Sequence, residues 1–471
     1  MKVFLVYPPW NIEEKLSGYS REMMKDVEAA TSPPLGLAYI AAVLEKAGHD
    51  VKIFDCQFLD QYDLFFNSLR KEKPDIVGVS VFTASVNSTF DLINRVKKIL
   101  PRTKIIVGGP HAGAAPEHCL KNRCIDIVVI GEGEVTILGI CSGKPLGKIE
   151  GIVYRSGGKI KYNRLRKPIE NLDSLPFPDR DLLPSIYRYR TEIEKLAREP
   201  YTSMFTSRGC PYRCIYCSKT VFGRSFRARS AKNVVDEMEF LINKYKVKHI
   251  HIYDDTFNND PKRVFDICNE IIKRGLDVTW DCESRVNTMS RELLKKMAEA
   301  GCTSVGYGVE SADQNILNTL QKDVDLKKVK DAVRWAREAG IRTRCYFIIG
   351  SPGETKDTVR KTIDFAKEAN PDFALYSILT PFPGTQLFDW LREKKLIKED
   401  QYVVRDIIQM GELTPGELKK ALNQAYREFY LRPGSILNHL KSINNLFMLK
   451  SYMRMASGFL KKYFFERTPL E

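Results

Sequence analysis

The sequence predicts an α/β protein with a doubly wound Rossmann-like domain, then a partial (βα)6 barrel and a helical C-terminal region. Short apolar runs alternate with amphipathic segments over residues 1–145, which is typical of an open, mostly parallel sheet covered by helices. The same alternation returns over residues 201–385 with the period of roughly 30 residues that βαβ units require. Residues 386–471 keep a helical periodicity without strand signals.

The composition is that of a chain with ordinary buried cores. Of 471 residues, 43% are hydrophobic, and 74 Lys+Arg against 59 Asp+Glu give a formal net charge of +15. Such a surplus favours anionic cofactors, lipid headgroups or nucleic acid, or it forms a solvated lysine-rich surface. No nucleic-acid recognition motif accompanies the charge, so we expect no nucleic-acid partner.

Cysteine usage and hydropathy indicate the cellular compartment. Eleven cysteines, three of them clustered, do not resemble a disulfide scaffold in a chain of this length and favour a reducing, cytoplasmic environment. The N-terminal residues 1–7 predict a strand, not a signal peptide. No run of about 18 apolar residues is present, so no transmembrane helix is expected.

In the first domain, glycine-rich turns follow two of the predicted strands. Gly108-Gly109 and Gly131-Glu132-Gly133 stand where a ligand of an open sheet would bind, beyond the carboxyl ends of the strands. Glycine lets a ligand approach the backbone closely, although tight turns alone also need it. The predicted strands are residues 3–7, 51–55, 76–82, 105–107 and 127–130, and the predicted helices are residues 34–47 and 90–100.

Residues 146–200 are predicted to connect the two domains. Strands at 149–154 and 159–162 flank Ser156-Gly157-Gly158, which predicts a hairpin. Repeated prolines between residues 175 and 184 then break regular structure, so an ordered linker is expected there.

One loop of the second domain carries the strongest chemical signal. Cys210, Cys214 and Cys217 have C-x3-C-x2-C spacing, and Tyr216 places an aromatic ring beside the last thiol. Iron–sulfur clusters are held by cysteine thiolates. Structural zinc normally takes four protein ligands, and no histidine lies nearby to be the fourth. Three thiolates on a four-iron cubane leave one iron open to bind a small molecule.

Charged residues follow the predicted barrel strands, where parallel barrels carry their chemistry. Carboxylates there can accept hydrogen bonds from an ammonium or from ribose hydroxyls, or they can cap the next helix. We expect Asp313 and Glu354 to be caps, and Cys268, Cys282, Cys302 and Cys345 to be core residues. The candidates for ligand contacts are Asp254, Asp255, Glu283, Arg285 and Glu310.

The C-terminal region is predicted to be helical. Thr414 and Pro415 form a typical helix start. Residues 436–465 carry five basic residues and no acid, with apolar residues at roughly helical spacing. Such a helix either lies on an anionic membrane as a peripheral contact or docks on the barrel.

Cys210, Cys214, Tyr216 and Cys217 match the C-x3-C-x-aromatic-C signature, so the second domain resembles the radical S-adenosylmethionine (SAM) superfamily. The resemblance implies a [4Fe-4S] cluster whose open iron binds SAM and cleaves it to a 5′-deoxyadenosyl radical. It also implies an external electron donor such as flavodoxin or ferredoxin, and low oxygen. The SAM contacts that it implies are Tyr216, Asp254 or Asp255 for the amino group, Glu310 for the ribose, Arg285 for the carboxylate and Ile348 for the adenine.

The first domain resembles the cobalamin-binding domain that precedes the radical domain in one large subgroup. Matching motifs include Pro33-Pro34-Leu35-Gly36, Gly108-Gly109-Pro110-His111 and Gly131-Glu132-Gly133-Glu134. No D-x-H-x-x-G sequence follows the first strand, so no histidine is expected on cobalt, and His111 is expected to face the tail of the ligand. The cobalamin contacts implied are Pro34, Leu35, Gly36, Ser80, Gly108, Gly109, His111, Gly131, Glu132 and Gly133.

Together the two resemblances imply a cobalamin-dependent radical SAM enzyme, with methylation of an unactivated carbon as the expected reaction. The segment 429–433 is similar to the tail of cyclase-like and lipid-modifying members, which favours an apolar or lipid-like small-molecule substrate. One alternative is a ring-forming or oxidative cyclase of the same architecture. Another is a non-enzymatic cobalamin or redox sensor.

Overall fold

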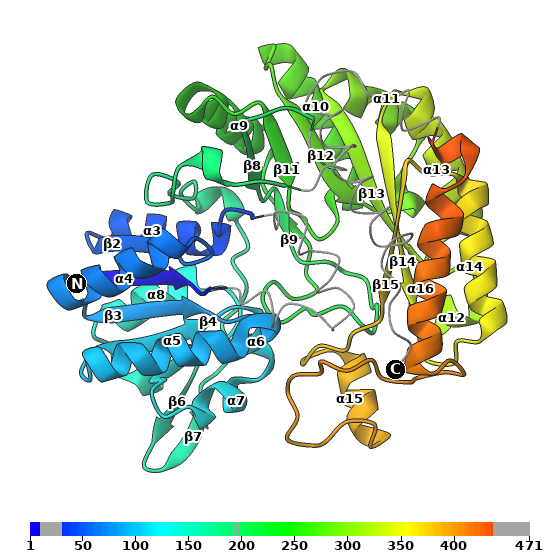
Figure 1. Cartoon of the computed structure of the whole chain (residues 1–471). Coiled ribbons are helices and arrows are strands. Elements are labelled where there is room, and N and C mark those ends of the chain that lie inside the picture. Colours follow the sequence, from blue (N-terminus) through cyan, green and yellow to red (C-terminus); the bar gives the residue numbers. More distant parts are fainter. Residues whose placement is uncertain (10–30, 192–194, 196, 437–471) are drawn as a thin grey trace.

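The computed structural model describes residues 1–9, 31–191, 195 and 197–436. Two α/β domains lie beside each other, the N-terminal one in blue and cyan and the barrel in green and yellow (Figure 1). The barrel and its C-terminal helix make up the larger part of the described chain. The predicted amphipathic helix at 436–465 falls almost wholly outside the described residues.

The N-terminal domain is built on a seven-stranded sheet. Its order is β2-β1-β3-β4-β5-β6-β7, in which β1 to β5 are parallel and β6 and β7 are antiparallel. The predicted hairpin is therefore present, but it pairs with β5 and extends the first sheet. The strands are β1 (Lys2–Tyr7), β2 (Asp50–Asp55), β3 (Ile76–Ser80), β4 (Lys104–Gly108), β5 (Ile127–Val129), β6 (Ile152–Ser156) and β7 (Lys159–Tyr162).

Helices cover both faces of this sheet because alternate strand residues point to opposite sides. Val3 and Leu5 pack with α3 (Leu35–Lys46) and α8 (Glu134–Cys141), whereas Phe4 and Val6 pack on the other face. The strand order reverses between β1 and β3, and ligands of doubly wound sheets bind at such a point. The other face carries α4 (Leu59–Glu72), α5 (Val86–Ile99), α6 (Pro110–Ala114) and α7 (Pro116–Lys121).

The second domain is a six-stranded, all-parallel partial barrel, as predicted. Its order is β15-β14-β13-β12-β11-β8. Cys268, Cys282, Cys302 and Cys345 are buried in its outer core, as expected. The strands are β8 (Tyr201–Met204), β11 (His249–Ile252), β12 (Thr279–Ser284), β13 (Cys302–Glu310), β14 (Arg342–Ile349) and β15 (Phe373–Ile378), and a short ladder joins β9 (Ser207–Arg208) to β10 (Arg227–Ala228).

Helices cover the outside of the barrel and several begin at side-chain caps. Asp313 accepts hydrogen bonds from the backbone of α12, as expected. The cap of α14 is Thr355, whereas Glu354 binds the preceding turn, so the capping role predicted for Glu354 is wrong. The helices are α9 (Ala231–Tyr245), α10 (Pro261–Arg274), α11 (Arg291–Glu299), α12 (Gln314–Thr319), α13 (Leu326–Glu338) and α14 (Lys356–Ala369), followed by α15 (Gln386–Glu393).

Helix α16 (Pro415–Tyr430), orange in Figure 1, packs along the last strand of the barrel. It begins at the predicted Thr414 cap. The Tyr426 hydroxyl bonds both the N–H and the carbonyl of Tyr376 in β15, and the Tyr430 hydroxyl bonds the same two groups of Ala374, at 2.9–3.2 Å. These bonds satisfy backbone groups that an edge strand leaves open. Segment 429–433 thus contributes to the barrel edge, a structural role.

Among the helices of the described residues, none is both long and apolar enough to cross a membrane.

Candidate functional site: an interdomain cavity and a cysteine loop

A cavity opens where β1, β3, β4 and β5 end. Its lining combines the first domain with Phe205, Arg208, Val221 and Phe222 of the second, so it lies between the domains. Leu5, Leu37, Ile40, Ile106, Val129 and Ile137 supply apolar surface. Six glycines supply bare backbone: Gly36, Gly78, Gly108, Gly109, Gly131 and Gly133.

The glycines suit a large ligand pressed against the strand ends. A Cβ added at Gly36 would meet no atom within 4 Å, so this position faces open space in the cavity. Gly109 and Gly131 have φ of +96° and +78°, a conformation that other residues rarely adopt. A Cβ at Gly109 would also lie 3.2 Å from the carbonyl oxygen of Val81. The apolar, glycine-lined cavity at the point of strand reversal fits a cobalamin.

The structure places most, but not all, of the expected cobalamin contacts in this cavity. Those that line it are Gly36, Ser80, Gly108, Gly109, Gly131, Glu132 and Gly133. Pro34 and Leu35 instead are buried at the start of α3, where Leu35 begins the helix that covers this face of the sheet.

His111 also departs from expectation. Helix α6 begins at Pro110, and the His111 ring is fully buried within hydrogen-bonding distance of Thr83 Oγ1 (3.0 Å) and His118 Nδ1 (2.9 Å). Burial, and to a lesser degree His118, lowers the pKa of His111 to about 3. The ring is therefore neutral and engaged with the protein, so the expected contact with the ligand tail is corrected.

The cysteine loop follows β9 directly. Cys210 is buried, whereas Cys214 and Cys217 are half-buried. Gly209 has φ of +82°, and a Cβ there would lie 2.3 Å from the carbonyl oxygen of Ser225, so only glycine fits at this bend. Within the described residues, no group of three His, Cys, Asp or Glu side chains is gathered closely enough to hold a single metal ion. A cubane binds each thiolate at a separate iron, which one short loop can supply.

Asp254 stabilises the entrance to this loop. Its carboxylate accepts hydrogen bonds from the backbone and hydroxyl of both Thr206 and Ser207, at 2.5–3.0 Å, and its side chain is buried. All four bonds are internal to the protein, so Asp254 is a loop-positioning residue. Of the two aspartates proposed for the amino group of a ligand, only Asp255 is exposed at the strand end.

Lys219 adds positive charge beside the thiols. Burial raises the pKa of Cys217, and Lys219 opposes that rise. Burial would lower the pKa of Lys219, but Cys217, Cys210 and Asp255 raise it overall. The ammonium is therefore charged, and it favours the thiolate forms that ligate iron.

Three predicted SAM residues come together on one side of the loop. Tyr216 packs in the cluster that contains Ile348, and it hydrogen-bonds Glu310. Glu310 ends β13 with φ of +70° and pairs with Lys322 at 2.9 Å, both side chains being buried. The pKa of Tyr216 is raised, first by burial and then by Glu310. The phenol is therefore neutral and can donate a hydrogen bond.

Arg285 lies on the other side of the loop. Its guanidinium carbon is 3.5 Å from the centre of the Tyr212 ring, and the group also donates to the Asp323 carbonyl. Stacking on a residue of the cysteine loop holds this cation close to the cluster position. Arg285 is thus held against the cysteine loop from outside it.

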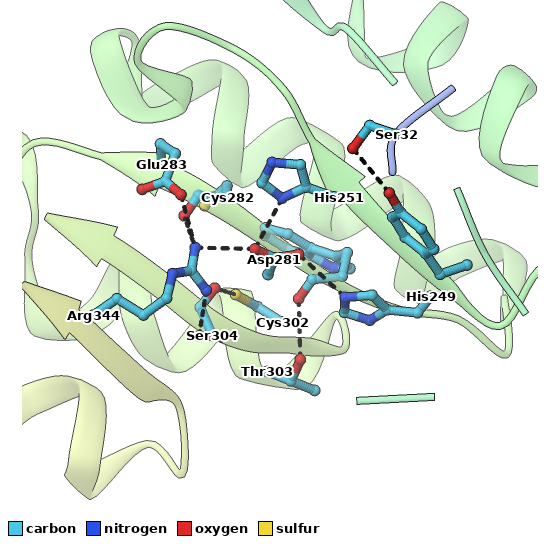
Figure 2. A network of polar contacts seen from close by, with 12 residues as sticks. Ser32, His249, His251, Asp281, Cys282, Glu283, Cys302, Thr303, Ser304 and Arg344 are labelled. Carbon is cyan, nitrogen blue, oxygen red and sulfur yellow. Dashed lines mark hydrogen bonds and ion pairs between the residues drawn. The ribbon is translucent and has the colours of Figure 1, made fainter. Parts of the chain in front are cut away.

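The barrel interior contains a buried ionic network that the sequence interpretation missed (Figure 2). Asp281 binds His249 at 3.1 Å, His251 at 3.0 Å and Arg344 at 3.0 Å, and all four side chains are at most 5% exposed. Arg344 also pairs with Glu283 at 3.0 Å, whose side chain is 29% exposed. Burial opposes ionisation of Asp281, but His251 and Arg344 hold its pKa well below the usual value. The signal in the sequence that could have revealed this network was Arg344, an arginine within a mostly apolar predicted strand.

Comparison with known proteins agrees with these two sites. Residues 204–366 match the family model of the radical SAM superfamily, and residues 26–140 match that of the B12 binding domain. The uncharacterized methyltransferase PH0819 of Pyrococcus horikoshii is 34% identical over 98% of this chain and 99% of its own. This chain belongs to the cobalamin-binding radical SAM enzymes. Its cofactors are accordingly a [4Fe-4S] cluster, SAM and cobalamin.

One further relative and one solved structure are also similar to this radical SAM enzyme. The anaerobic magnesium-protoporphyrin IX monomethyl ester cyclase of Cereibacter sphaeroides is 30% identical over 86% of this chain and 68% of its own. The structure of the cobalamin-dependent radical enzyme OxsB, with aqua-cobalamin and SAM bound, superposes with a TM-score of 0.74 at 20% identity, covering 98% of this chain and 72% of that one. At 20% identity, the likeness to OxsB shows that the two chains share a fold.

Proposed function

We propose that this enzyme methylates an unactivated carbon of a small molecule. The observation that carries the proposal is that residues of both domains line the cavity. Phe205 and Arg208, which precede Cys210 by a few residues, line the cavity that fits cobalamin. When bound, SAM on the cluster supplies a radical and cobalamin carries a methyl group. Residues of this chain would hold the two cofactors on opposite sides of one space.

The chain's own groups would bind and orient. Glu310 and Tyr216 can hydrogen-bond ribose hydroxyls, and Arg285 can pair with the SAM carboxylate. Asp255 is the acceptor for the SAM ammonium. Ile348 offers apolar surface for the adenine. The domain interface would exclude water from the radical, which prevents its quenching by solvent.

Counting the products of SAM tests the reaction. The holoenzyme would be incubated anaerobically with methyl-deuterated SAM, reduced flavodoxin as the proposed electron donor and a low-mass extract of the source cells. Equal amounts of S-adenosylhomocysteine and 5′-deoxyadenosine, with label in a new product, are expected. Deoxyadenosine without S-adenosylhomocysteine would contradict methylation and favour a cyclase, and neither product would favour a sensor.

The cyclase is the second candidate, and one observation favours it. The magnesium-protoporphyrin IX monomethyl ester cyclase of Cereibacter sphaeroides is 30% identical over 86% of this chain. Because cyclisation transfers no methyl group, the label experiment separates the two reactions.

We further propose an apolar or lipid-like substrate and a peripheral membrane contact, supported only by the basic amphipathic pattern of residues 436–465. Segment 429–433 no longer supports it, because Phe429 and Tyr430 pack on the barrel. Co-sedimentation of the full chain with anionic and neutral liposomes tests the contact. Salt-sensitive binding to anionic liposomes, lost when the chain ends at Ile436, is expected. Equal recovery with both lipids would contradict it.

A further inference from the structure

We propose that Arg208 is a positioning residue that fixes the cobalamin cavity against the cluster loop. Its Nη1 donates to Glu132 Oε1 at 2.7 Å and its Nη2 to Glu134 Oε1 at 2.6 Å. Both glutamates belong to the Gly131–Glu134 turn beyond β5, whereas Arg208 lies two residues before Cys210. The three side chains are 3–6% exposed. One guanidinium thus connects the turn that contacts cobalamin with the loop that holds the cluster.

A planar guanidinium is suited to this geometry because it can bond two carboxylates with separate nitrogens. Burial alone would lower the pKa of Arg208, but Glu134 and Glu132 raise it above its usual range. Its carbon also lies 5.1 Å from the ring centres of Tyr39 and Phe222, which come from different domains. All five side chains line the cavity. Arg208 is therefore held by groups from both domains at the lining of the cavity.

Arg227 extends the connection. Arg227 lies opposite Arg208 in the antiparallel ladder of β9 and β10. Its guanidinium donates to both carboxylate oxygens of Glu132, at 3.0 and 2.9 Å. Glu132 also accepts from the backbone of Ile169 at 2.7 Å. The carboxylate of Glu132 is therefore fully engaged with the protein, which changes the cobalamin contact expected for it into a positioning role. Two carboxylates face two guanidiniums, so removing any one leaves this buried group with a net charge, and removing Arg208 leaves Glu134 without its guanidinium partner.

This inference rests on the proposed function, because the separation of cobalt and cluster matters only if both act on one substrate. A lysine at position 208 keeps the charge, but its single ammonium nitrogen lacks the planar fork with which the guanidinium bonds the two glutamates through separate nitrogens. We therefore expect Arg208→Lys and Arg208→Gln to loosen the relation between the cofactors while each chain still folds.

The buried pair Arg180–Glu237 offers a matched control. Arg180 Nη1 lies 2.8 Å from Glu237 Oε1, with both side chains at most 4% exposed, and neither residue lines the cavity. Arg180→Gln removes a comparable buried ion pair whose two residues lie outside the cavity lining. It should lower the melting temperature and leave the cofactors unchanged.

The experiment uses anaerobically reconstituted holoenzyme with hydroxocobalamin. Iron content, cobalamin Kd and the dipolar coupling between cob(II)alamin and the reduced cluster would be measured by pulsed electron paramagnetic resonance. We expect full iron content in both Arg208 variants, a Kd raised at least about tenfold, and a broad cobalt–cluster distance distribution in place of a narrow one. Arg180→Gln should match the wild type in all three.

Wild-type Kd and a narrow distance distribution in Arg208→Lys would overturn the positioning role. Equal changes in Arg180→Gln would overturn it too, because they would reduce Arg208 to a general stabiliser. Should Arg208→Gln fail to fold, Arg208→Lys and Glu134→Gln decide the outcome. Failure of the wild type to bind cobalamin or a cluster would instead contradict the proposed function itself.

Discussion

The cavity beside the N-terminal sheet forms where parallel strands end, whereas the ionic network of the barrel interior lies near the beginnings of its strands, and the two linings differ in kind. Glycines and aliphatic side chains dominate the first, with Gly36, Gly108 and Gly131 exposing backbone. The second holds a buried network of Asp281 and Arg344 with two histidines. Bare backbone and apolar surface therefore dominate one region, whereas charge and hydrogen bonds organise the other. Inserted side chains should damage the first, and lost charges the second.

The largest effect is expected in the loop between these regions. Cys210→Ala, Cys214→Ala or Cys217→Ala should each abolish cluster assembly and deoxyadenosine formation, because the loop offers no replacement thiol. Absorbance, iron content and product counting measure this. Cys124→Ala, a half-buried cysteine of the N-terminal domain, is the control. A variant that keeps four irons per chain and cleaves SAM would refute the ligand assignment.

Local patterns predicted the architecture and this loop, because apolar alternation and cysteine spacing are properties of adjacent residues. Long-range partners were beyond such patterns. The sequence pattern of Asp254 is that of a ligand contact, but its carboxylate is bonded to Thr206 and Ser207, 48 and 47 residues away. Glu132 similarly binds Arg208, 76 residues away. A motif gives the type of a residue, but only the fold shows whether another part of the chain already uses its polar atoms.

The next largest effect is expected when a side chain is inserted into the glycine-lined cavity. Gly36→Leu adds a side chain at a position of the cavity lining where a Cβ meets no atom within 4 Å, so we expect the fold to persist. We expect cobalamin Kd to rise about a thousandfold, roughly 4 kcal/mol, while iron content is unchanged. Gly416→Leu, at an equally open position on α16, should have no effect on either. Unchanged cobalamin affinity in Gly36→Leu would place the ligand elsewhere.

Removing charge from the barrel interior should cost stability. Arg344→Met leaves Asp281 buried without its guanidinium partner, which should lower the free energy of unfolding by about 3–5 kcal/mol. Denaturant titration of the holoenzyme measures it. Arg334→Met removes an exposed arginine paired with Asp331 and should cost less than about 1 kcal/mol. The double variant Asp281→Asn/Arg344→Met should lose less than Arg344→Met alone, and equal losses in the two would contradict the pairing.

The stability of the protein should depend on pH through the buried carboxyl of Glu354 in the barrel. Burial raises the pKa of this carboxyl to about 7, although Gly350 and Ser351 donate backbone bonds to it. The folded protein keeps a proton that the unfolded chain releases above about pH 4.5, so Glu354 should reduce stability progressively from about pH 4.5 to 7, by roughly 3 kcal/mol. Glu354→Gln should therefore raise the melting temperature at pH 8 and change it little at pH 4.5, unlike the exposed control Glu393→Gln. An equal effect at both pH values would contradict the shift.

Cofactor stoichiometry tests the central claim, that two separate sites on one chain meet at the domain interface. Iron and cobalt would be quantified in anaerobically reconstituted wild type, Cys210→Ala and Gly36→Leu. We predict four irons and one cobalt per wild-type chain, cobalt without the cluster in Cys210→Ala, and four irons without cobalt in Gly36→Leu. Loss of both metals in either variant, or a wild type that holds only one of them, would contradict the account.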